Sequence, residues 1–188
     1  MKETPKEYVE RILAKVEAKA KGQNPLKVQD TTAKKLAQLV KGLPASKLRK
    51  RPEPDKWSIA EILAHVGDTE IAVGWRLRSI LASPGTPIQG FDQDAWVAVG
   101  HYEKRDPLKC IEQFRAAREA NLVLLKSLTP EQWKHSGMHS ERGDESIERI
   151  VTLICGHDIN HLEQIETILS TRSNSARKAV KAKKAKRK

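Results

Sequence analysis

Two long segments of this chain, residues 58 to 83 and 147 to 171, carry apolar side chains at the three- and four-residue spacing of an α-helix. The first stripe consists of Ile59, Ile62, Leu63, Val66, Val73, Leu77 and Ile80. The second consists of Ile150, Ile154, His157, His161, Ile165 and Ile168. Such a stripe covers one side of a helix and must pack against another element to leave water. The chain is therefore expected to fold around a core shared between helices.

Two further helices are expected at residues 25 to 42 and 107 to 127. Asn24 before Pro25 is typical of an N-cap followed by proline in the first helical turn. Ser58 and Glu61 have the spacing of a capping box, which predicts the start of the longest internal helix. Aromatic residues make up only 4% of the chain, and its aliphatic residues favour helices over a sandwich of strands. We predict an all-α four-helix bundle.

The segments between these helices differ in length and character. The prolines of "RPEPDKW" exclude a helix and indicate an extended connection. The stretch "IQGFDQDAWVAVGHYEKRD", residues 88 to 106, lacks periodicity and is predicted to be an ordered loop within a long crossover between the second and third bundle helices. Thr129 with Gln132 predicts one short extra turn, and "HSERGDES" is expected to be a connection containing glycine.

The two ends of the chain fall outside the bundle pattern. Residues 1 to 23 are expected to be an N-terminal helical extension, with a helix that starts at Pro5. Residues 24 to 171 form the predicted bundle domain. The formal net charge is +11, but nine basic and no acidic residues follow Thr171, so the remainder carries only +2. Residues 172 to 188 are therefore expected to be a disordered basic tail.

Cysteine content and hydropathy indicate in which cellular compartment the protein is expected. Cys110 and Cys155 are too few and too far apart for a disulfide framework. No apolar run approaches the roughly 20 residues that span a bilayer, and the N-terminus does not resemble a signal peptide. We expect a cytoplasmic protein with no membrane partner. Cys155 is near His157 in sequence but faces elsewhere on a helix, so it is not a candidate ligand or nucleophile.

The histidines are the strongest chemical signal in the sequence. His157 and His161 are four residues apart, so their rings project within about 40° of one another on a helix. His65 is the histidine within another predicted core helix, whereas His101, His135 and His139 fall in loops or beside a short turn. Three buried imidazoles without partners would cost roughly 1 to 3 kcal/mol each, a cost that a bound metal removes.

Two interpretations of this pattern remain open from spacing alone. Three imidazole ligands with an open coordination position are typical of a catalytic metal site. However, a buried histidine is more often hydrogen-bonded to a carbonyl or carboxylate, and paired histidines also occur on solvated helix faces.

Other polar residues lie close to the histidines on the predicted helices. Gln164 shares a face with His161 and is a candidate to bind a ring nitrogen or a metal-bound ligand, with core packing as the alternative. Asp68 and Thr69 lie one turn beyond His65, and either is placed to orient an imidazole. For Asp68 we favour a solvated helix face.

Arg118 interrupts an apolar stripe, and a buried charge needs a partner. We favour a structural carboxylate such as Glu61 or Glu70 over an anionic substrate group. Trp57 and Trp96 are expected to be packing anchors, although the loop that holds Trp96 is well placed to cover an opening.

Three segments resemble one known family. "PDKWSIAEILAHVGDTE" is similar to the signature of the DinB-like family of small metal-binding four-helix bundles, in which a Trp-Ser pair precedes a helix with a ligand histidine, here His65. "GHDINHLEQI" resembles the C-terminal helix of that family, whose two ligand histidines are here His157 and His161. "FRAAREANLVLLKSLTPEQW" resembles its third helix and the following turn. The resemblance covers about residues 24 to 171.

The resemblance implies a three-histidine site for a divalent ion, commonly nickel or zinc, in a bundle that often dimerises. Some relatives transfer low-molecular-weight thiols or use a thiol cofactor in isomerisation. The implied function is that of a metal-dependent enzyme, either a thiol S-transferase or a hydrolase, with a small-molecule substrate and a homodimeric state. The metal would stabilise a thiolate in the first case and activate water in the second.

A rival hypothesis assigns the chain to a different class of protein. Nine cations in residues 172 to 188 suit salt-sensitive, non-specific contact with nucleic acid. The bundle would then be a non-catalytic platform. Against this, the predicted folded part carries no recognisable motif that reads nucleic acid.

Overall fold

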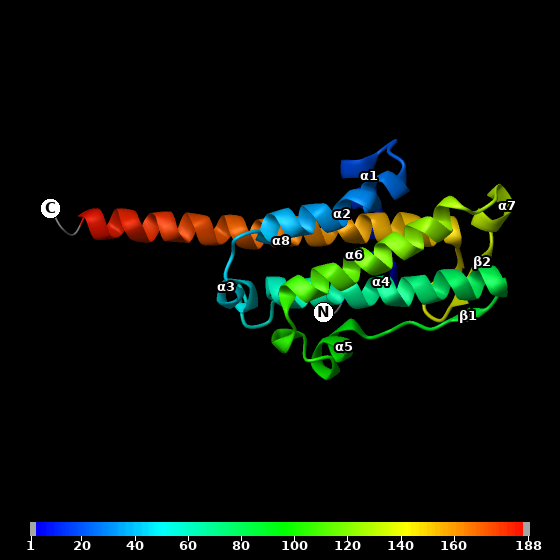
Figure 1. Ribbon diagram of the computed structural model, residues 1–188, viewed down its shortest axis with the longest axis horizontal. Coiled ribbons are helices and arrows are strands. Elements are labelled where there is room, and N and C mark those ends of the chain that lie inside the picture. The colour runs from blue at the N-terminus through cyan, green and yellow to red at the C-terminus, as the bar shows by residue number, and fades with distance from the viewer. Residues whose placement is uncertain (1–2, 186–188) are drawn as a thin grey trace.

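Four long helices lie side by side along the length of the molecule in the computed structural model (Figure 1). They are α2 (Pro25–Val40), α4 (Ile59–Ala82), α6 (Pro107–Lys126) and α8 (Ile147–Ala185). The structure describes the backbone of residues 3–185 and the side chains of residues 3–171. The predicted four-helix bundle is confirmed. In the part of the chain that the structure describes, no helix is both long enough and apolar enough to cross a membrane.

The predicted helix starts carry the expected caps. The Asn24 side chain accepts a hydrogen bond from the Leu26 amide at 2.9 Å. Ser58 and Glu61 form both bonds of a capping box, as do Thr129 and Gln132 at the short helix α7 (Pro130–Trp133). These reciprocal bonds satisfy amides that a helix leaves unpaired in its first turn.

The C-terminal helix differs from its predicted length. We expected it to end near Thr171, but α8 continues to Ala185, past the end of the bundle (Figure 1). For residues 172–185 only the backbone is described, and residues 186–188 lie outside the described residues. The disorder that we expected of residues 172–188 therefore stays a prediction.

The bundle core is divided by a band of buried polar groups. At one end, the apolar cluster includes Ile62, Leu63, Phe114 and Ile165; at the other it includes Leu77, Ile80, Leu125, Ile147 and Ile150. Between them lie buried polar and charged side chains from all four helices: Gln29, Thr32, His65, Thr69, Glu70, Arg118, Asn121, His157, Asp158 and His161. Apolar packing alone would not require such a band, so its residues are the first candidates for a functional site.

A small three-stranded sheet lies at the end of the bundle where α8 begins. Its strands are β1 (Pro87–Ile88), β2 (Ser136–His139) and β3 (Gly143–Ser146), in the order β1-β2-β3. β1 pairs with β2 in parallel, with Ile88 opposite His139, and β2 pairs antiparallel with β3. The sequence analysis predicted only connections here. Strands of two to four residues without apolar alternation give no local signal, because their pairing comes from distant segments.

The crossover also contains more helix than expected. Residues 88 to 106 were predicted to be an ordered loop, but they contain α5 (Gln93–Val99) and the 3₁₀ turn η1 (Tyr102–Lys104). The Asp92 carboxylate caps α5 by accepting hydrogen bonds from the amides of Asp94 and Ala95. Another short helix, α3 (Ala45–Arg49), precedes "RPEPDKW". Helices of five to seven residues are too short to show a 3.6-residue period.

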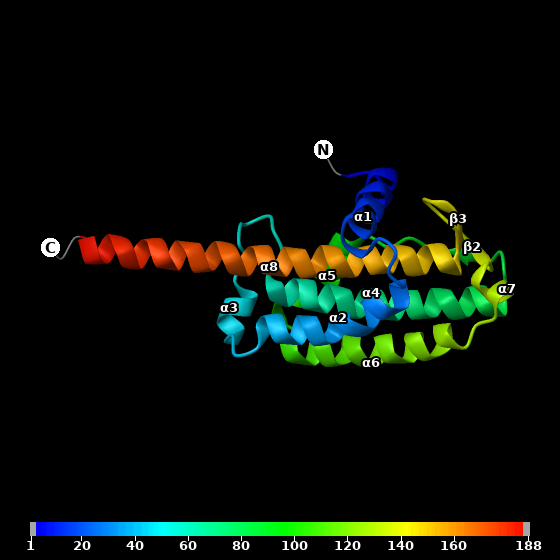
Figure 2. The same cartoon turned by 90° about the horizontal axis from the view of Figure 1, so that it is seen from above.

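The first helix, α1 (Pro5–Ala20), crosses α8 at a steep angle (Figure 2). Val9 and Ile12 form a small apolar cluster with Leu153 of α8. The contact is close because α8 has no side chain at Gly156, where a Cβ would lie 2.5 Å from the backbone oxygen of Ile12. The N-terminal helix therefore packs on the bundle, while the domain boundary at residue 23 stays a prediction.

We predict that Gly156→Ala destabilises the protein by about 1 to 3 kcal/mol, because the new methyl group must displace α1. The same change in an open helix normally gains up to about 1 kcal/mol. Urea unfolding measures the difference. The control is Gly67→Ala in α4, whose Cβ would lie 3.3 Å from the side-chain nitrogen of Gln113 and 3.5 Å from the backbone oxygen of Cys110, with no contact as short as that at Gly156. Equal stabilisation of both variants would contradict the close contact.

Candidate metal centre

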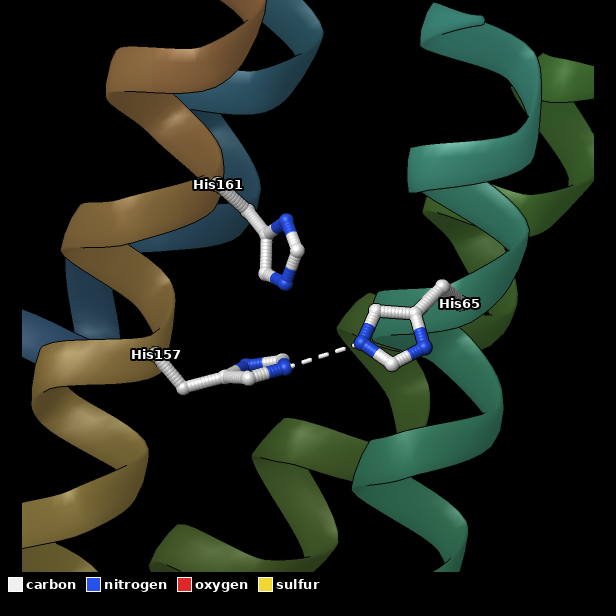
Figure 3. Close-up of side chains that lie close together, drawn as sticks. All are labelled: His65, His157 and His161. Carbon is white, nitrogen blue, oxygen red and sulfur yellow. Dashed lines mark hydrogen bonds between the residues drawn. The ribbon is translucent and has the colours of Figure 1, made fainter. Parts of the chain in front are cut away.

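Three imidazoles from two helices meet in the polar band. His65 projects from α4, and His157 and His161 project from α8 toward it (Figure 3). The Nε2 atoms of His65 and His157 lie 3.0 Å apart. Each of the three rings offers one ligand nitrogen, and these atoms all lie within 4.8 Å of one another. The structure thus brings together the three histidines that the sequence singled out, each no more than 7% exposed.

Burial keeps these imidazoles neutral at physiological pH. Desolvation, reinforced by the neighbouring imidazoles, lowers the pKa of His65 and of His157 well below the usual value. Desolvation also lowers the pKa of His161 to about 4, against a smaller opposing effect of its hydrogen bond to Gln164. A neutral imidazole has a free lone pair, which is the form that binds a metal.

Gln164 orients His161 for that role. Its Oε1 lies 2.9 Å from Nδ1 of His161. An amide oxygen can only accept, so the Nδ1–H of His161 donates and the proton of the neutral ring sits on Nδ1. The lone pair on Nε2 then faces the other two rings (Figure 3). Histidine ligands of metals commonly have such a partner for the second ring nitrogen.

The donor set fits a divalent metal ion. The neutral rings of His65 and His157 can share at most one proton across their 3.0 Å contact, and Nε2 of His161 makes no hydrogen bond within the described residues. A cation placed among the three nitrogens would satisfy all of them. Three imidazoles suit Zn, Ni, Cu or Fe and leave coordination positions for a substrate or water.

A buried ion network lies directly behind His157. Arg118, 3% exposed, donates to Asp158 at 2.5 and 3.0 Å and to Glu70 at 2.8 Å. Thr32 also donates to Asp158, at 2.8 Å, so the network joins α2, α4, α6 and α8. The predicted ion pair between Arg118 and a structural carboxylate is therefore confirmed for Glu70. For Glu61 it is wrong, because Glu61 binds Arg51 instead. Asp158 was not singled out from the sequence.

Asp68 and Thr69 differ in their surroundings. Asp68 is not on a solvated face, as we expected, because its carboxylate accepts hydrogen bonds from Tyr102, Arg105 and Gln113 at 2.7 to 3.0 Å. The unexpected turn η1 brings Tyr102 over α4. Thr69 is buried one turn from His65, and its hydroxyl makes no hydrogen bond within the described residues.

Trp57 and Cys155 behave as predicted, whereas Trp96 is too exposed to be the packing anchor that we expected. Trp57 packs against the core, with its ring 4.9 Å from that of His65. Trp96 stacks on Phe91 at 4.4 Å and is 36% exposed. Cys155 is buried beside Ala20 and Ile159, and desolvation raises the pKa of its thiol to about 11. It is neither a ligand nor an activated nucleophile.

A cavity of about 430 Å³ opens beside His65 and His157. Its wall is built by α4, α8, the start of the chain, the crossover and the β2–β3 hairpin. Polar groups on the wall include Thr69, Arg76, His139, Glu141, Arg142 and Glu145. The sequence analysis considered His139 only as a poor ligand candidate, and His139 is not in the cluster. Two arginines of the wall were missed as well: Arg142, which a hairpin with no local signal brings to the cavity, and Arg76 of α4, whose surroundings come from distant segments.

The family model of the DinB superfamily matches residues 30–165. The chain belongs to the DinB superfamily. This confirms the resemblance noted from the motifs around the three histidines. Membership of the superfamily does not identify the reaction, because members of one fold superfamily perform different chemistry.

Curated relatives support the same assignment. The chain is 27% identical, over 150 residues, to an Oceanobacillus iheyensis protein named "Putative metal-dependent hydrolase", covering 80% of this chain and 86% of the relative. It is 24% identical over 148 residues to YfiT of Bacillus subtilis, which has the same descriptive name, covering 78% and 83% of the two chains.

Two solved structures share the fold. YfiT from Bacillus subtilis, described as having "an unusual four-helix bundle topology", matches with a TM-score of 0.74 and 21% identity, covering 79% of this chain and 86% of YfiT. A mycothiol-dependent maleylpyruvate isomerase matches with a TM-score of 0.59 and 11% identity, covering 75% and 59%. At these identities the likeness shows the arrangement of helices and no more.

We predict that Arg118→Met destabilises the protein by about 3 to 5 kcal/mol, because it leaves Glu70 and Asp158 as uncompensated buried charges. Urea unfolding measures the loss. Arg115→Met is the matched control on the same helix, since Arg115 is exposed and pairs only with Glu119; there we expect less than about 0.5 kcal/mol. Similar small losses in both variants would show that the network does not support the fold.

Proposed function

We propose that this chain is a metal-dependent enzyme in which His65, His157 and His161 hold one divalent ion, nickel or zinc. The observation that carries the proposal is the convergence of three buried, neutral imidazoles beside a cavity of about 430 Å³. The cavity has the size of a small-molecule site. The names of the relatives in the superfamily support metal-dependent chemistry.

The chain supplies the ligands, their orientation and the surroundings of the reaction. When bound, the metal acts as a Lewis acid that activates water for hydrolysis or a thiol for transfer. Gln164 holds the proton of His161 on Nδ1, away from the other rings. Val73 and Ile150 line the cavity next to the histidines and limit the access of water. Thr69 offers a free hydroxyl, one turn from His65, to hydrogen-bond a substrate.

We place hydrolysis first and thiol transfer second. Hydrolysis is supported by the names of the relatives. Thiol transfer, with a low-molecular-weight thiol as co-substrate, is supported by the fold shared with a mycothiol-dependent enzyme. A screen of esters, amides and carbon electrophiles, each with and without added thiol, separates the two: product formed without thiol supports hydrolysis, and product that requires thiol supports transfer.

We predict that the purified chain, made without a histidine tag, contains about one equivalent of divalent metal per chain, and that alanine at position 65, 157 or 161 removes it. Elemental analysis after gel filtration gives the metal content, and circular dichroism checks folding. His101→Asn is the control: His101 is exposed, lies outside the cluster and has a φ of 46°, which asparagine tolerates. Unchanged metal in all three alanine variants would contradict the proposal.

A second proposal concerns the last 17 residues, whose nine basic side chains suit non-specific binding to nucleic acid. We predict that the full chain binds duplex DNA weakly, with affinity that falls steeply as salt increases, and that a chain ending at Thr171 loses this binding. Fluorescence anisotropy at several salt concentrations measures both. Equal binding by the two chains would exclude the tail as the contact.

We also propose a cytoplasmic homodimer. Ile71, Trp75 and Val123 are more than half exposed on α4 and α6, which supports association through an apolar face. Sedimentation equilibrium of the full chain measures the oligomeric state directly.

A further inference from the structure

A partly buried arginine lines the cavity beside the histidines and has no ion-pair partner within the described residues. Arg76 lies on α4, three turns beyond His65. Its Nη2 donates to the backbone oxygen of Gln89 at 2.7 Å, and its guanidinium lies 5.4 Å from the centroid of the Phe91 ring. No carboxylate of the described residues lies within 4.0 Å of it. Enclosed arginines normally have such a partner.

A second donor lies at the same corner of the cavity. His139 is 2% exposed, and its Nδ1 accepts a hydrogen bond from the amide of Glu141 at 3.1 Å. The proton of the neutral ring is therefore on Nε2, which makes no hydrogen bond within the described residues. Strand pairing places His139 opposite Ile88. The next residue, Gln89, accepts the hydrogen bond from Arg76, so Arg76 and His139 lie at the same end of the cavity.

The acidic residues of the cavity wall do not neutralise these donors. Glu145 is bound by Arg142 through two hydrogen bonds of 2.7 and 2.8 Å. Asp92 accepts from two amides of α5, and Glu3 is paired with an arginine of α1. Glu141 also acts on both donors, but it is exposed, so water and salt weaken its attraction without removing it. The wall thus offers a buried donor without a partner within the described residues, the His139 Nε2–H, and beside it a partly buried cation, Arg76.

We propose that Arg76 and His139 bind a carboxylate or phosphate group of the substrate. A guanidinium and an imidazole N–H suit the oxygens of such an anion, and desolvation strengthens these charge-assisted bonds. The direction of the Arg76 pKa agrees with this: burial and the nearby Arg142 lower it more than Glu145 and Glu141 raise it, and a bound anion would act against the lowering. The inference rests on the proposed function, since it names the substrate class of that same site.

The geometry also limits the shape of the substrate. Eleven residues separate Arg76 from His65, so their Cα atoms lie about 16 Å apart along α4. Thr69 lies between them on the cavity wall, with its free hydroxyl. A molecule that contacts both the histidines and Arg76 must therefore be extended, with its anionic group at the opposite end from its reacting group.

The test follows anion binding at individual side chains. The full chain, labelled with ¹⁵N, is titrated with inorganic phosphate and separately with acetate, with and without added zinc. We expect saturable shifts of the Arg76 Nε and His139 Nε2 resonances. The stronger of the two anions indicates whether the substrate carries a phosphate or a carboxylate.

Matched variants assign the binding to the two donors. Arg76→Gln should weaken binding roughly tenfold or more, and Arg76→Lys should retain part of the affinity because the charge remains. His139→Asn removes the Nε2 donor, whereas His139→Gln places an amide N–H near its position, so we expect weaker binding only in the first. Glu141→Gln should strengthen binding by removing a competing negative charge.

The outcomes separate this inference from the proposed function. Zinc uptake without any shift at Arg76 or His139 would overturn the anion site and leave the metal proposal intact. Shifts confined to lysines and arginines of residues 172 to 188 would overturn it as well. Saturable shifts at both side chains in a chain that takes up no zinc would support the anion site and contradict the metal proposal.

Discussion

The ion network of Arg118, Asp158 and Glu70 is the constraint on which the rest of this bundle depends. Burying three charges in a helical core costs several kcal/mol per ion, and only close, complementary hydrogen bonds recover that cost. Such bonds require one relative placement of the helices that carry them. Because Asp158 directly follows His157, the same bonds also fix the side of α8 that faces α4. The network thus couples helix packing to the position of the imidazoles.

Much of this arrangement was predictable from local sequence. The stripes of α4 and α8, the proline and serine caps, and the four-residue spacing of His157 and His161 each reflect interactions within one turn of helix. His65 was found because it is the histidine within another helix that was predicted to be in the core. The pairing of Arg118 with a carboxylate followed from the cost of a lone buried charge, although the choice between Glu61 and Glu70 required the fold.

The parts that sequence did not predict depend on contacts between distant segments. The strands of the small sheet are too short for a periodic pattern, and β1 and β2 are separated by the whole of α6. His139 therefore gave no sign that it would be buried, and Arg76 gave no sign that its helix would meet a strand end. Asp68 was misjudged for the same reason: Tyr102 and Arg105 from the crossover and Gln113 from α6, which bind it, are 34 to 45 residues later in the chain.

The candidate metal ligands lie in the polar band of the core, where polar side chains are buried in place of apolar ones. Apolar clusters at the two ends of the bundle bury the aliphatic side chains on both sides of this band. The middle carries polar atoms that lack partners within the described residues, namely the facing nitrogens of three imidazoles and the Thr69 hydroxyl. Beside the small sheet, the cavity wall adds the His139 Nε2–H and the partly buried Arg76 guanidinium. Each would be a stability defect in isolation, yet all of them line or adjoin one cavity. A cation bound by the three imidazoles and an anion bound by Arg76 and His139 would satisfy both groups of side chains. The unpaired polar groups thus define a cavity with a proposed cation site at one end and a proposed anion site at the other.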